Sequence, residues 1–215
     1  NQMSLKRNLD ELVYETICQG FVGGAYTAGM RLDPAELSER YQVSKTPVIQ
    51  ALKRMAHERI VEITSGGKYV IPVATRQEIE NVCQARLLFE ENALMALCKN
   101  GNPQAVAILK AIEEKCRKFY EAESYDQYFM SDMSFHRTMV EMAGNGCLAD
   151  LYHILINRYM VIRNTTGTTL VHDPIAGKEH GQMIRAIEEK DCDKAKRLIE
   201  NHIYKMEERL NEKVN

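Results

Sequence analysis

The stretch from residue 37 to residue 55 constrains the fold of this chain more than any other part. It reads LSERYQVSKTPVIQALKRM, a short helical pattern followed by a tight turn at 42–43 and a second helical pattern entered at 44–47. The apolar side of the second pattern consists of Val48, Ala51, Leu52 and Met55. The polar side consists of Lys45, Gln50, Lys53 and Arg54. This layout predicts a helix-turn-helix, in which one helix braces a second whose first residues reach base edges in the major groove of DNA.

A β-hairpin is predicted directly after the second helix. Residues 60–63 (IVEI) and 68–72 (KYVIP) are rich in strand-forming residues and flank the glycine turn 64–67 (TSGG). Because an isolated hairpin is marginally stable, it must pack on the preceding helices as a wing. With a further helix expected over about 5–21, residues 1–73 predict a winged-helix domain of three helices and a two-strand wing.

Only helices are predicted after this domain. The spacing of Thr75 to Glu78, and of Ser124 to Gln127, is that of a capping box, and Asn102 precedes a proline at a first helical position. The predicted helices cover 34–42, 45–57, 76–99, 103–121, 125–143, 146–165, 174–189 and 192–212. We therefore expect a mainly α protein whose winged helix-turn-helix is joined to an all-α, antiparallel helical bundle over 74–215.

The positive charge of the chain is local. The net charge of the 215 residues is −2, but residues 40–68 carry six Lys or Arg and two Asp or Glu. Phosphate contacts supply much of DNA affinity, so a local patch matters more than the total, although most charge clusters are only solvated helix faces. No apolar run approaches the roughly 18–20 residues that span a bilayer. Six scattered cysteines without a CxxC pair favour reduced thiols, so we expect a cytoplasmic protein with no membrane partner.

The first domain resembles the GntR family of bacterial transcription regulators. The resemblance rests on 32–37 (LDPAEL), 43–48 (VSKTPV), Ala51-Leu52 and the glycine wing 67–70 (GKYV). It implies a homodimer on a palindromic double-stranded DNA operator, with the wing tip near the minor groove. The residues that it places at DNA are Arg31 or Arg40, Ser44, Lys45, Thr46, Gln50 and, at the wing, Gly66, Gly67 and Lys68. Ser44 and Thr46 would serve equally well as helix caps.

Two departures from the family make the operator hard to infer. Lys45 stands where the family usually has Arg, and Ile49-Gln50 stands where it has Arg-Glu. An arginine presents a planar fork that suits guanine, whereas a lysine presents a point charge. Ile49 offers only apolar contact, for instance with a thymine methyl group, or else packs beneath the wing.

Four side chains in the helical part could form a metal site. Asp132 and His136 are four residues apart on one predicted helix, so they share a face. His180 and His202 lie on the last two predicted helices. Nitrogen and oxygen ligands of this kind suit Zn²⁺, Ni²⁺, Mn²⁺ or Fe²⁺. By spacing alone, a hydrogen-bonded Asp/His pair and unrelated histidines are the simpler interpretation.

The helical part also resembles the FCD effector domain of the FadR-type GntR group. The resemblance rests on Asp132-x-x-Phe135-His136, 143–145 (AGN), Glu179-His180 and 191–202. It implies that Asp132, His136, His180 and His202 bind a divalent metal and that a small carboxylate is the effector. Arg86 would pair with that effector or, equally, with Glu90 four residues on. The other candidate effector-binding residues are Asn145, Arg158 and Arg163, of which Asn145 could be only a helix-end residue.

These features predict a transcription regulator that binds DNA and responds to a ligand, and that is not an enzyme. Two alternatives stay open. The metal itself could be the effector, or the site could be purely structural. A metal-dependent hydrolase is a weaker alternative, since Glu179 is the one plausible general base near the ligands and the winged helix would have no role.

Overall fold

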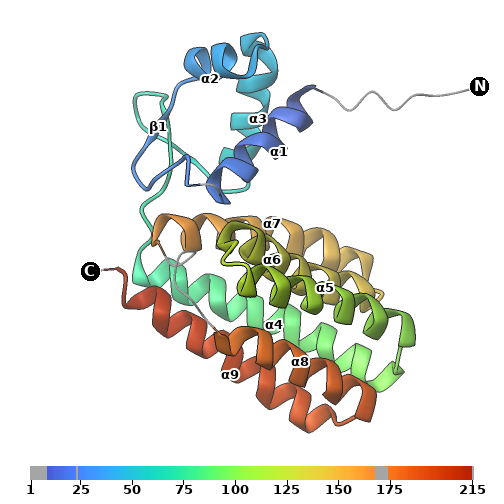
Figure 1. Ribbon diagram of the computed structural model, residues 1–215. Helices are drawn as coiled ribbons and strands as arrows, with labels where there is room; N and C mark the ends of the chain where they lie inside the picture. The colour runs from blue at the N-terminus through green and yellow to red at the C-terminus, as the bar shows by residue number, and fades with distance from the viewer. Residues whose placement is uncertain (1–8, 23, 168–173, 215) are drawn as a thin grey trace, which may run out of the picture. The chain divides into compact units, whose positions relative to one another are not determined.

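The structure is a computed structural model that describes residues 9–22, 24–167 and 174–214. Contacts divide the chain into two compact units, and the division falls between Val73 and Ala74. The described residues are mainly helical, with one small antiparallel sheet in the N-terminal unit (Figure 1). The predicted mainly α fold with an N-terminal winged helix-turn-helix is therefore confirmed.

The N-terminal unit contains three helices and a sheet with strand order β1-β3-β2 in its described residues. Its elements are α1 (Leu9–Val22), β1 (Arg31–Leu32), α2 (Pro34–Tyr41), α3 (Lys45–His57), β2 (Glu62–Ile63) and β3 (Tyr69–Val70). The wing sheet has one more strand than the predicted hairpin, because β1 pairs with β3 and places Leu32 opposite Tyr69. Two residues are too few to show a strand alternation in the sequence. The predicted start of the first helix, at residue 5, lies outside the described residues.

Local hydrogen bonds set the bounds of the helix-turn-helix. The Asp33 carboxylate accepts from the Ala35 backbone N–H at 2.8 Å, and a proline occupies the first turn of α2. Gln42 ends α2 with φ 54°, and its backbone N–H donates to carbonyls of the last turn. The chain then enters α3, whose Val48 and Leu52 are fully buried. The apolar stripe that defined the motif in the sequence is thus its packing face.

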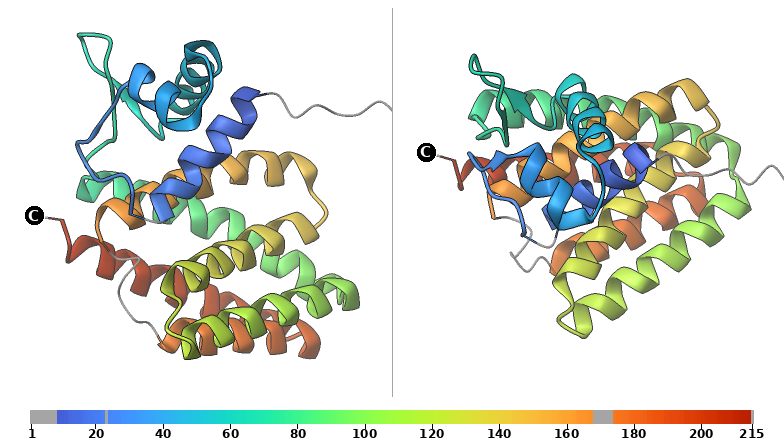
Figure 2. Two further views of the ribbon diagram at one scale, coloured as in Figure 1. Left: turned by 45° about the horizontal axis from the view of Figure 1, so that its top comes forward. Right: turned by 90° about the horizontal axis from the view of Figure 1, so that it is seen from above.

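The C-terminal unit is a helical bundle, and no strand occurs in its described part. Its helices are α4 (Arg76–Asn100), α5 (Pro103–Glu121), α6 (Tyr125–Met142), α7 (Gly146–Thr165), α8 (Pro174–Glu189) and α9 (Cys192–Asn211). Long helices pack side by side, α4 against α9 and α5 against α6 (Figures 1 and 2). Every described boundary agrees with the predicted helices to within one residue. None of the described helices is both long and apolar enough to cross a membrane.

Two capping boxes were predicted in this bundle, and one forms. Thr75 and Glu78 exchange both capping hydrogen bonds, at 3.2 Å and 3.0 Å, so that prediction is confirmed. Ser124 precedes α6 as predicted, but its side chain makes no cap hydrogen bond, so the second box is wrong. Glu123, with φ 55°, already turns the chain there, and the Ser124 carbonyl starts the helix by accepting from Tyr128.

Candidate metal centre and DNA-reading surface

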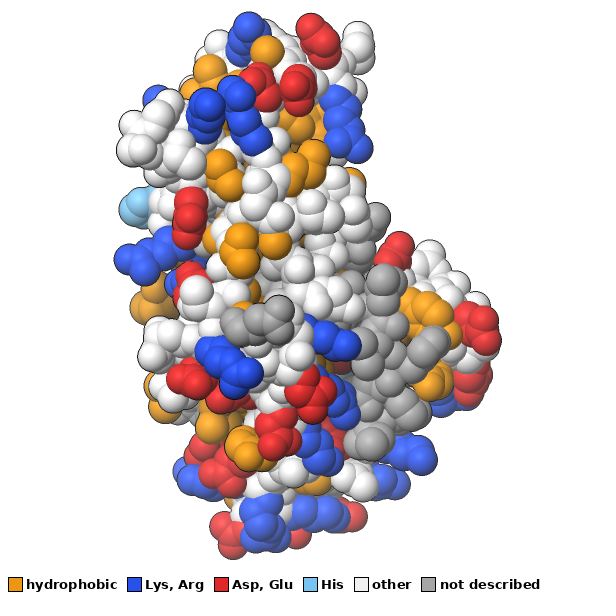
Figure 3. Space-filling view, turned by 90° about the vertical axis from the view of Figure 1, so that its left-hand side faces the viewer, with side chains coloured by type: hydrophobic (Ala, Val, Ile, Leu, Met, Phe, Trp, Pro, Cys, Tyr) orange, Lys and Arg blue, Asp and Glu red, His pale blue; other side chains and the backbone are white. Residues whose placement is uncertain are grey.

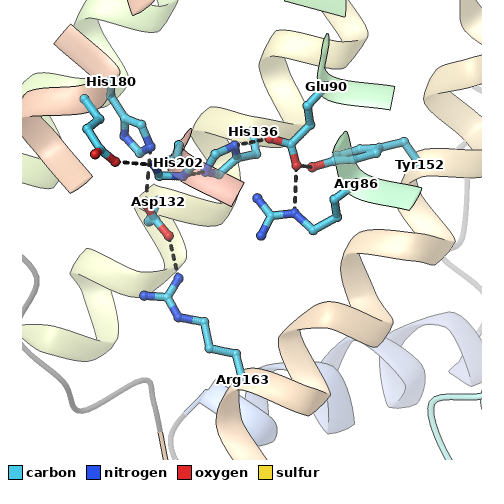
Figure 4. A network of polar contacts seen from close by, with 9 residues as sticks. Arg86, Glu90, Asp132, His136, Tyr152, Arg163, His180 and His202 are labelled. Atoms are coloured by element: carbon cyan, nitrogen blue, oxygen red, sulfur yellow. Dashed lines mark hydrogen bonds and ion pairs between the residues drawn. The ribbon is translucent and has the colours of Figure 1, made fainter. Parts of the chain in front are cut away.

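Three buried histidines from three helices converge inside the C-terminal unit. His136 lies on α6, His180 on α8 and His202 on α9, and none is more than 3% exposed. One ring nitrogen of each lies within 4.8 Å of those of the other two, and Figure 4 shows the three rings gathered at one place. Three imidazoles this close together are a suitable donor set for a divalent metal ion.

Two carboxylates hold two of these rings by their Nδ1 atoms. His136 Nδ1 lies 2.7 Å from Glu90 Oε2, and His202 Nδ1 lies 2.8 Å from Glu179 Oε2. Burial would raise the pKa of each carboxyl, but neighbouring cations and hydrogen bonds outweigh it and lower both pKa values. Both groups are therefore ionised and can only accept, so each Nδ1 carries the proton that it donates.

The remaining nitrogens of the two rings face each other. His136 Nε2 and His202 Nε2 are 3.3 Å apart. Burial lowers the pKa of His136 against the opposing effect of Glu90, so this ring is neutral and its Nε2 bears a lone pair. His202 Nε2 faces the same position, so a cation bound there would be shared by the two rings. A carboxylate behind a histidine that points its other nitrogen at a shared position is the arrangement found at metal sites.

Asp132 and His180 add buried polar atoms that have no hydrogen-bond partner. These atoms are Oδ1 of Asp132 and both ring nitrogens of His180. His180 Nε2 lies 3.6 Å from Asp132 Oδ1, and the His180 ring stacks on Phe135 with centroids 4.0 Å apart. Because buried polar atoms are nearly always paired, these three atoms require an explanation. One carboxylate oxygen and three imidazoles fit a divalent cation.

Arg163 forms an ion pair with Asp132, the carboxylate of the candidate metal site. Its Nη1 donates to Asp132 Oδ2 at 2.6 Å, and its guanidinium lies 4.6 Å from the Phe129 ring centroid. Burial would raise the pKa of Asp132, but the charge of Arg163 holds it well below the usual range. Asp132 is thus an ionised, oriented oxygen donor. Arg163 was expected to contact the effector, and the structure places it on this carboxylate.

Arg86 makes the ion pair with Glu90 that was one of its two predicted roles. Its Nε donates to Glu90 Oε1 at 2.7 Å, and the Tyr152 hydroxyl donates to the same oxygen at 2.7 Å. The guanidinium lies 3.9 Å from the centroid of the Tyr159 ring. The Nη2 of Arg86 and the hydroxyl of Tyr159 are buried without a hydrogen-bond partner. Arg86 therefore uses its Nε for Glu90, while its Nη2 has no acceptor.

Sequence reasoning missed the residues that hold the buried histidines. Glu90 was considered as an ion-pair partner of Arg86, and Glu179 as a possible base. Their positions beside the buried rings decide the tautomers of His136 and His202. The Asn145 side chain is exposed and caps α7 by accepting from the Leu148 N–H at 3.2 Å. It is therefore a helix-end residue and not a member of the buried network. Arg158 is half-exposed on α7.

The residues predicted to contact DNA lie on the exposed side of α3. Ser44, Lys45, Thr46 and Gln50 are all exposed, opposite the buried apolar stripe. Ser44 occupies the N-cap position of α3, but its side chain makes no cap hydrogen bond. Its hydroxyl is therefore not committed to the helix. Ile49 is half-buried, which distinguishes neither apolar contact with DNA nor packing beneath the wing.

The wing tip is also exposed. Gly67 has φ 73° and donates its N–H to the Thr64 carbonyl at 2.8 Å, a tight turn that a residue with a side chain rarely adopts. Gly66 and Lys68 beside it are exposed. Arg31 forms an exposed ion pair with Asp33 at 2.9 Å, and Arg40 is exposed at the end of α2.

One member of the basic cluster has a structural role instead. Arg54 donates to Glu58 at 2.9 Å and to Glu11 at 2.6 Å, and its guanidinium lies 4.0 Å from the Tyr14 ring centroid. It therefore braces α1 against α3. Figure 3 shows Lys and Arg side chains at the surface of the winged-helix unit, with acidic and hydrophobic side chains between them.

The chain is similar to several transcription regulators and to solved structures of the same fold. The HTH-type transcriptional repressor NanR of Klebsiella aerogenes is 23% identical, over 92% of this chain and 84% of that protein. The gluconate operon transcriptional repressor of Bacillus subtilis is 29% identical over 55% of this chain and 49% of that protein. The solved structure of Escherichia coli McbR/YncC has a TM-score of 0.85 at 18% identity and covers 96% of this chain and 99% of its own. A putative GntR transcriptional regulator from Rhodococcus sp. RHA1 has a TM-score of 0.81 at 15% identity and covers 94% and 96%.

Both units also match family models. Residues 9–71 match the bacterial regulatory proteins of the gntR family, and residues 81–205 match the FCD domain. The FCD match alone covers more than half of the chain. The chain belongs to the GntR family of bacterial regulatory proteins, in the FadR-type group that carries an FCD domain, and is a DNA-binding transcription regulator.

Proposed function

We propose that this regulator is a homodimeric repressor whose FCD unit binds a divalent metal ion and a small organic acid that changes operator affinity. The observation that carries the proposal is the pair of Nε2 atoms of His136 and His202, which lie 3.3 Å apart while Glu90 and Glu179 hold the opposite side of each ring. Repression is supported by the names of two relatives, NanR and the gluconate operon repressor.

The proposed metal ligands combine one carboxylate oxygen with three imidazole nitrogens. They are Asp132, His136, His180 and His202, a set that suits Zn²⁺, Ni²⁺, Mn²⁺ or Fe²⁺. When bound, such an ion supplies a Lewis acid that can accept a carboxylate oxygen of a ligand. The chain's own contribution is to orient the imidazoles of His136 and His202 through Glu90 and Glu179, and to hold the Asp132 carboxylate through Arg163.

The proposed effector site includes Arg86. Its Nη2 is buried and has no hydrogen-bond partner, so a carboxylate reaching it would gain charge-assisted hydrogen bonds at little desolvation cost to the protein. One relative is named for the gluconate operon, and gluconate is a carboxylate, which supports this class of ligand. The proposal leaves out Asn145, which is exposed.

The proposed output is the exposed face of α3 together with the wing. In a homodimer, two recognition helices must match two half-sites of the operator, so a small change in their spacing breaks the register. An effector can cause such a change only by binding one arrangement more tightly than the other. Lys45 and Gln50, both exposed on α3, are the proposed base- or phosphate-contacting residues.

The hydrolase alternative is weakened by the contacts of its candidate base. Glu179 Oε2 lies 2.8 Å from His202 Nδ1, and Glu179 Oε1 accepts from Lys205 Nζ at 2.6 Å. Both oxygens are thus engaged, and the hydrogen bonds lower the pKa of the carboxyl against the effect of burial, so it is a poor proton acceptor. The relatives that match are regulators.

Measurements of operator binding distinguish two hypotheses, one in which a carboxylate is the effector and one in which the metal itself is. The operator would be obtained by in vitro selection, and its binding to the full chain followed by fluorescence anisotropy. Zn²⁺, Ni²⁺ or Mn²⁺ would be titrated into metal-free protein, and small carboxylates into metal-loaded protein. We expect the carboxylates to change the affinity of the loaded protein. A response to metal that no carboxylate modifies would establish the metal as effector instead.

A further inference from the structure

Two cysteines that are far apart in the sequence meet at one end of the helical bundle. Cys98 lies near the end of α4, and Cys192 is the first residue of α9. Their two thiols are in hydrogen-bonding contact. A disulfide requires sulfur atoms that can approach to about 2 Å from helices already close together, and this pair meets that requirement.

Backbone contacts fix the position of both cysteines. The Ala186 carbonyl accepts from the Asp191 N–H at 2.9 Å and from Cys98 Sγ at 3.5 Å. Cys192 follows Asp191 directly, so one carbonyl anchors both sides of the pair. Gly101, which caps α4, lies so close to the turn before α9 that a Cβ there would come within 2.7 Å of a side chain of that turn. The end of α4 therefore adjoins the start of α9 (Figure 1).

The two thiols differ in their access to solvent. Cys98 is fully buried, and burial raises the pKa of its thiol to about 12, so it stays protonated. Cys192 is half-exposed. An oxidant from solvent therefore reaches Cys192 first, while Cys98 lies behind it. An accessible cysteine with a second cysteine in contact is the arrangement in which an oxidised sulfur is captured as a disulfide.

We propose that Cys98 and Cys192 form a modification site for peroxides, at which oxidation makes a reversible disulfide between α4 and α9. In the first step, the Cys192 sulfur attacks one peroxide oxygen, the O–O bond breaks, and the thiol proton leaves with the released oxygen. The sulfur is oxidised to a sulfenic acid and the peroxide is reduced. In the second step, the Cys98 sulfur attacks the sulfenic sulfur, the S–O bond breaks, and the Cys98 proton leaves with the hydroxide as water. A small thiol reverses the link by exchange.

The surrounding structure accommodates the oxidised pair. Oxidation removes the Cys98 S–H donor, but the Ala186 carbonyl keeps the Asp191 N–H, so no buried acceptor loses its last partner. The disulfide closes a long loop of the chain, so it should restrict the unfolded state and stabilise the folded one. It does not depend on the proposed metal or effector, because neither cysteine belongs to the candidate metal centre.

Oxidation of the full, reduced chain with hydrogen peroxide tests the proposal. Catalase would stop the reaction, an alkylating agent would block the remaining thiols, and peptides would be mapped by mass spectrometry without reduction. We expect a cross-linked pair of peptides that contain Cys98 and Cys192, and its loss after treatment with dithiothreitol. The unfolding temperature of the oxidised chain should rise by about 5 to 15 °C, as for a disulfide in a chain of this size.

Three serine variants assign the order of the two steps. Cys98→Ser should leave Cys192 as a sulfenic acid that dimedone captures, and Cys192→Ser, at a half-exposed position, should protect Cys98 and abolish the rise in unfolding temperature. Cys147→Ser is the matched control, because Cys147 is exposed on α7, and it should leave the disulfide unchanged. Oxidation of Cys147 while Cys98 and Cys192 still react with the alkylating agent would overturn the proposal, as would a disulfide from Cys192 to any other cysteine.

Discussion

Glu90→Gln tests whether the carboxylate behind His136 tunes metal binding. Glu90 is fully buried and accepts from Arg86 Nε, the Tyr152 hydroxyl and His136 Nδ1, each at 2.7 Å. Glutamine has nearly the same shape, but it removes the charge and replaces one acceptor oxygen with a donor. At least one of the three donors then loses its acceptor, and His136 loses the negative charge that makes it a better ligand.

Two effects of different size should follow. Loss of a partner behind a ligating histidine typically costs about 10- to 100-fold in metal affinity. Breaking a buried ion pair leaves Arg86 uncompensated and should cost about 3–5 kcal/mol of the free energy of unfolding. The metal effect is the one that bears on the proposed site, because the loss of stability would follow from the ion pair alone.

The metal affinity would be measured by competition with a chromophoric chelator, with circular dichroism to confirm that the variant is folded. Glu91→Gln is a matched control, since Glu91 is the next residue on α4 and forms only a half-exposed ion pair with Lys196 at 2.9 Å. The control should bind metal as the original chain does. Equal metal affinities for Glu90→Gln and Glu91→Gln would refute the role of Glu90.

A double variant separates the effect of Glu90 on His136 from its effect on the stability of the fold. Arg86→Met combined with Glu90→Gln removes both charges of the pair, so most of the lost stability should return. Because His136 Nδ1 still faces an amide, metal affinity should stay low. Recovery of metal affinity together with stability would mean that Glu90 acts only by holding the fold.

Three further outcomes are expected. Metal analysis of purified protein should give about one ion per chain, and His136→Ala should lower that content, because one ligand of the proposed set is lost; an unchanged content would exclude the site. Lys45→Ala should weaken operator binding and, if Lys45 contacts a phosphate, reduce the slope of log affinity against log salt concentration by about 1. As a control, Lys118→Ala on the exposed surface of the other unit should change neither the affinity nor the slope. Met55→Ala, at a fully buried position of α3, should lower the free energy of unfolding by about 2–5 kcal/mol in urea denaturation and abolish DNA binding once the winged helix unfolds.

Much of the fold was predictable because its signals are local. Asp33, Thr75 and Asn102 each bond backbone N–H groups two or three residues away, so the chemistry that starts these helices is contained in a few consecutive residues. The prediction missed β1 because that strand depends on a distant partner, β3. The capping box at Ser124 failed for a local reason, since Glu123 with φ 55° already turns the chain there.

The candidate site was predictable in part for a similar reason. Asp132 and His136 share a face of α6 because they are four residues apart, which spacing alone shows. His180 and His202 could be joined to them only through resemblance to the FCD domain. The roles of Glu90 and Glu179 could not be predicted, because each depends on which ring nitrogen faces it across a helix interface.

By itself the sequence determined the helices, the caps at Thr75 and Asn102, the apolar stripe of α3 and the glycine turn of the wing, since all of these depend on residues close together in the chain. Only the tertiary structure decided the chemistry of the buried network. It brings Glu90 of α4 to His136 of α6 and Glu179 of α8 to His202 of α9, and it leaves Arg86 Nη2 without a partner. Tautomers, charges and unpaired donors are set by atoms within hydrogen-bonding distance, and those atoms come from different helices.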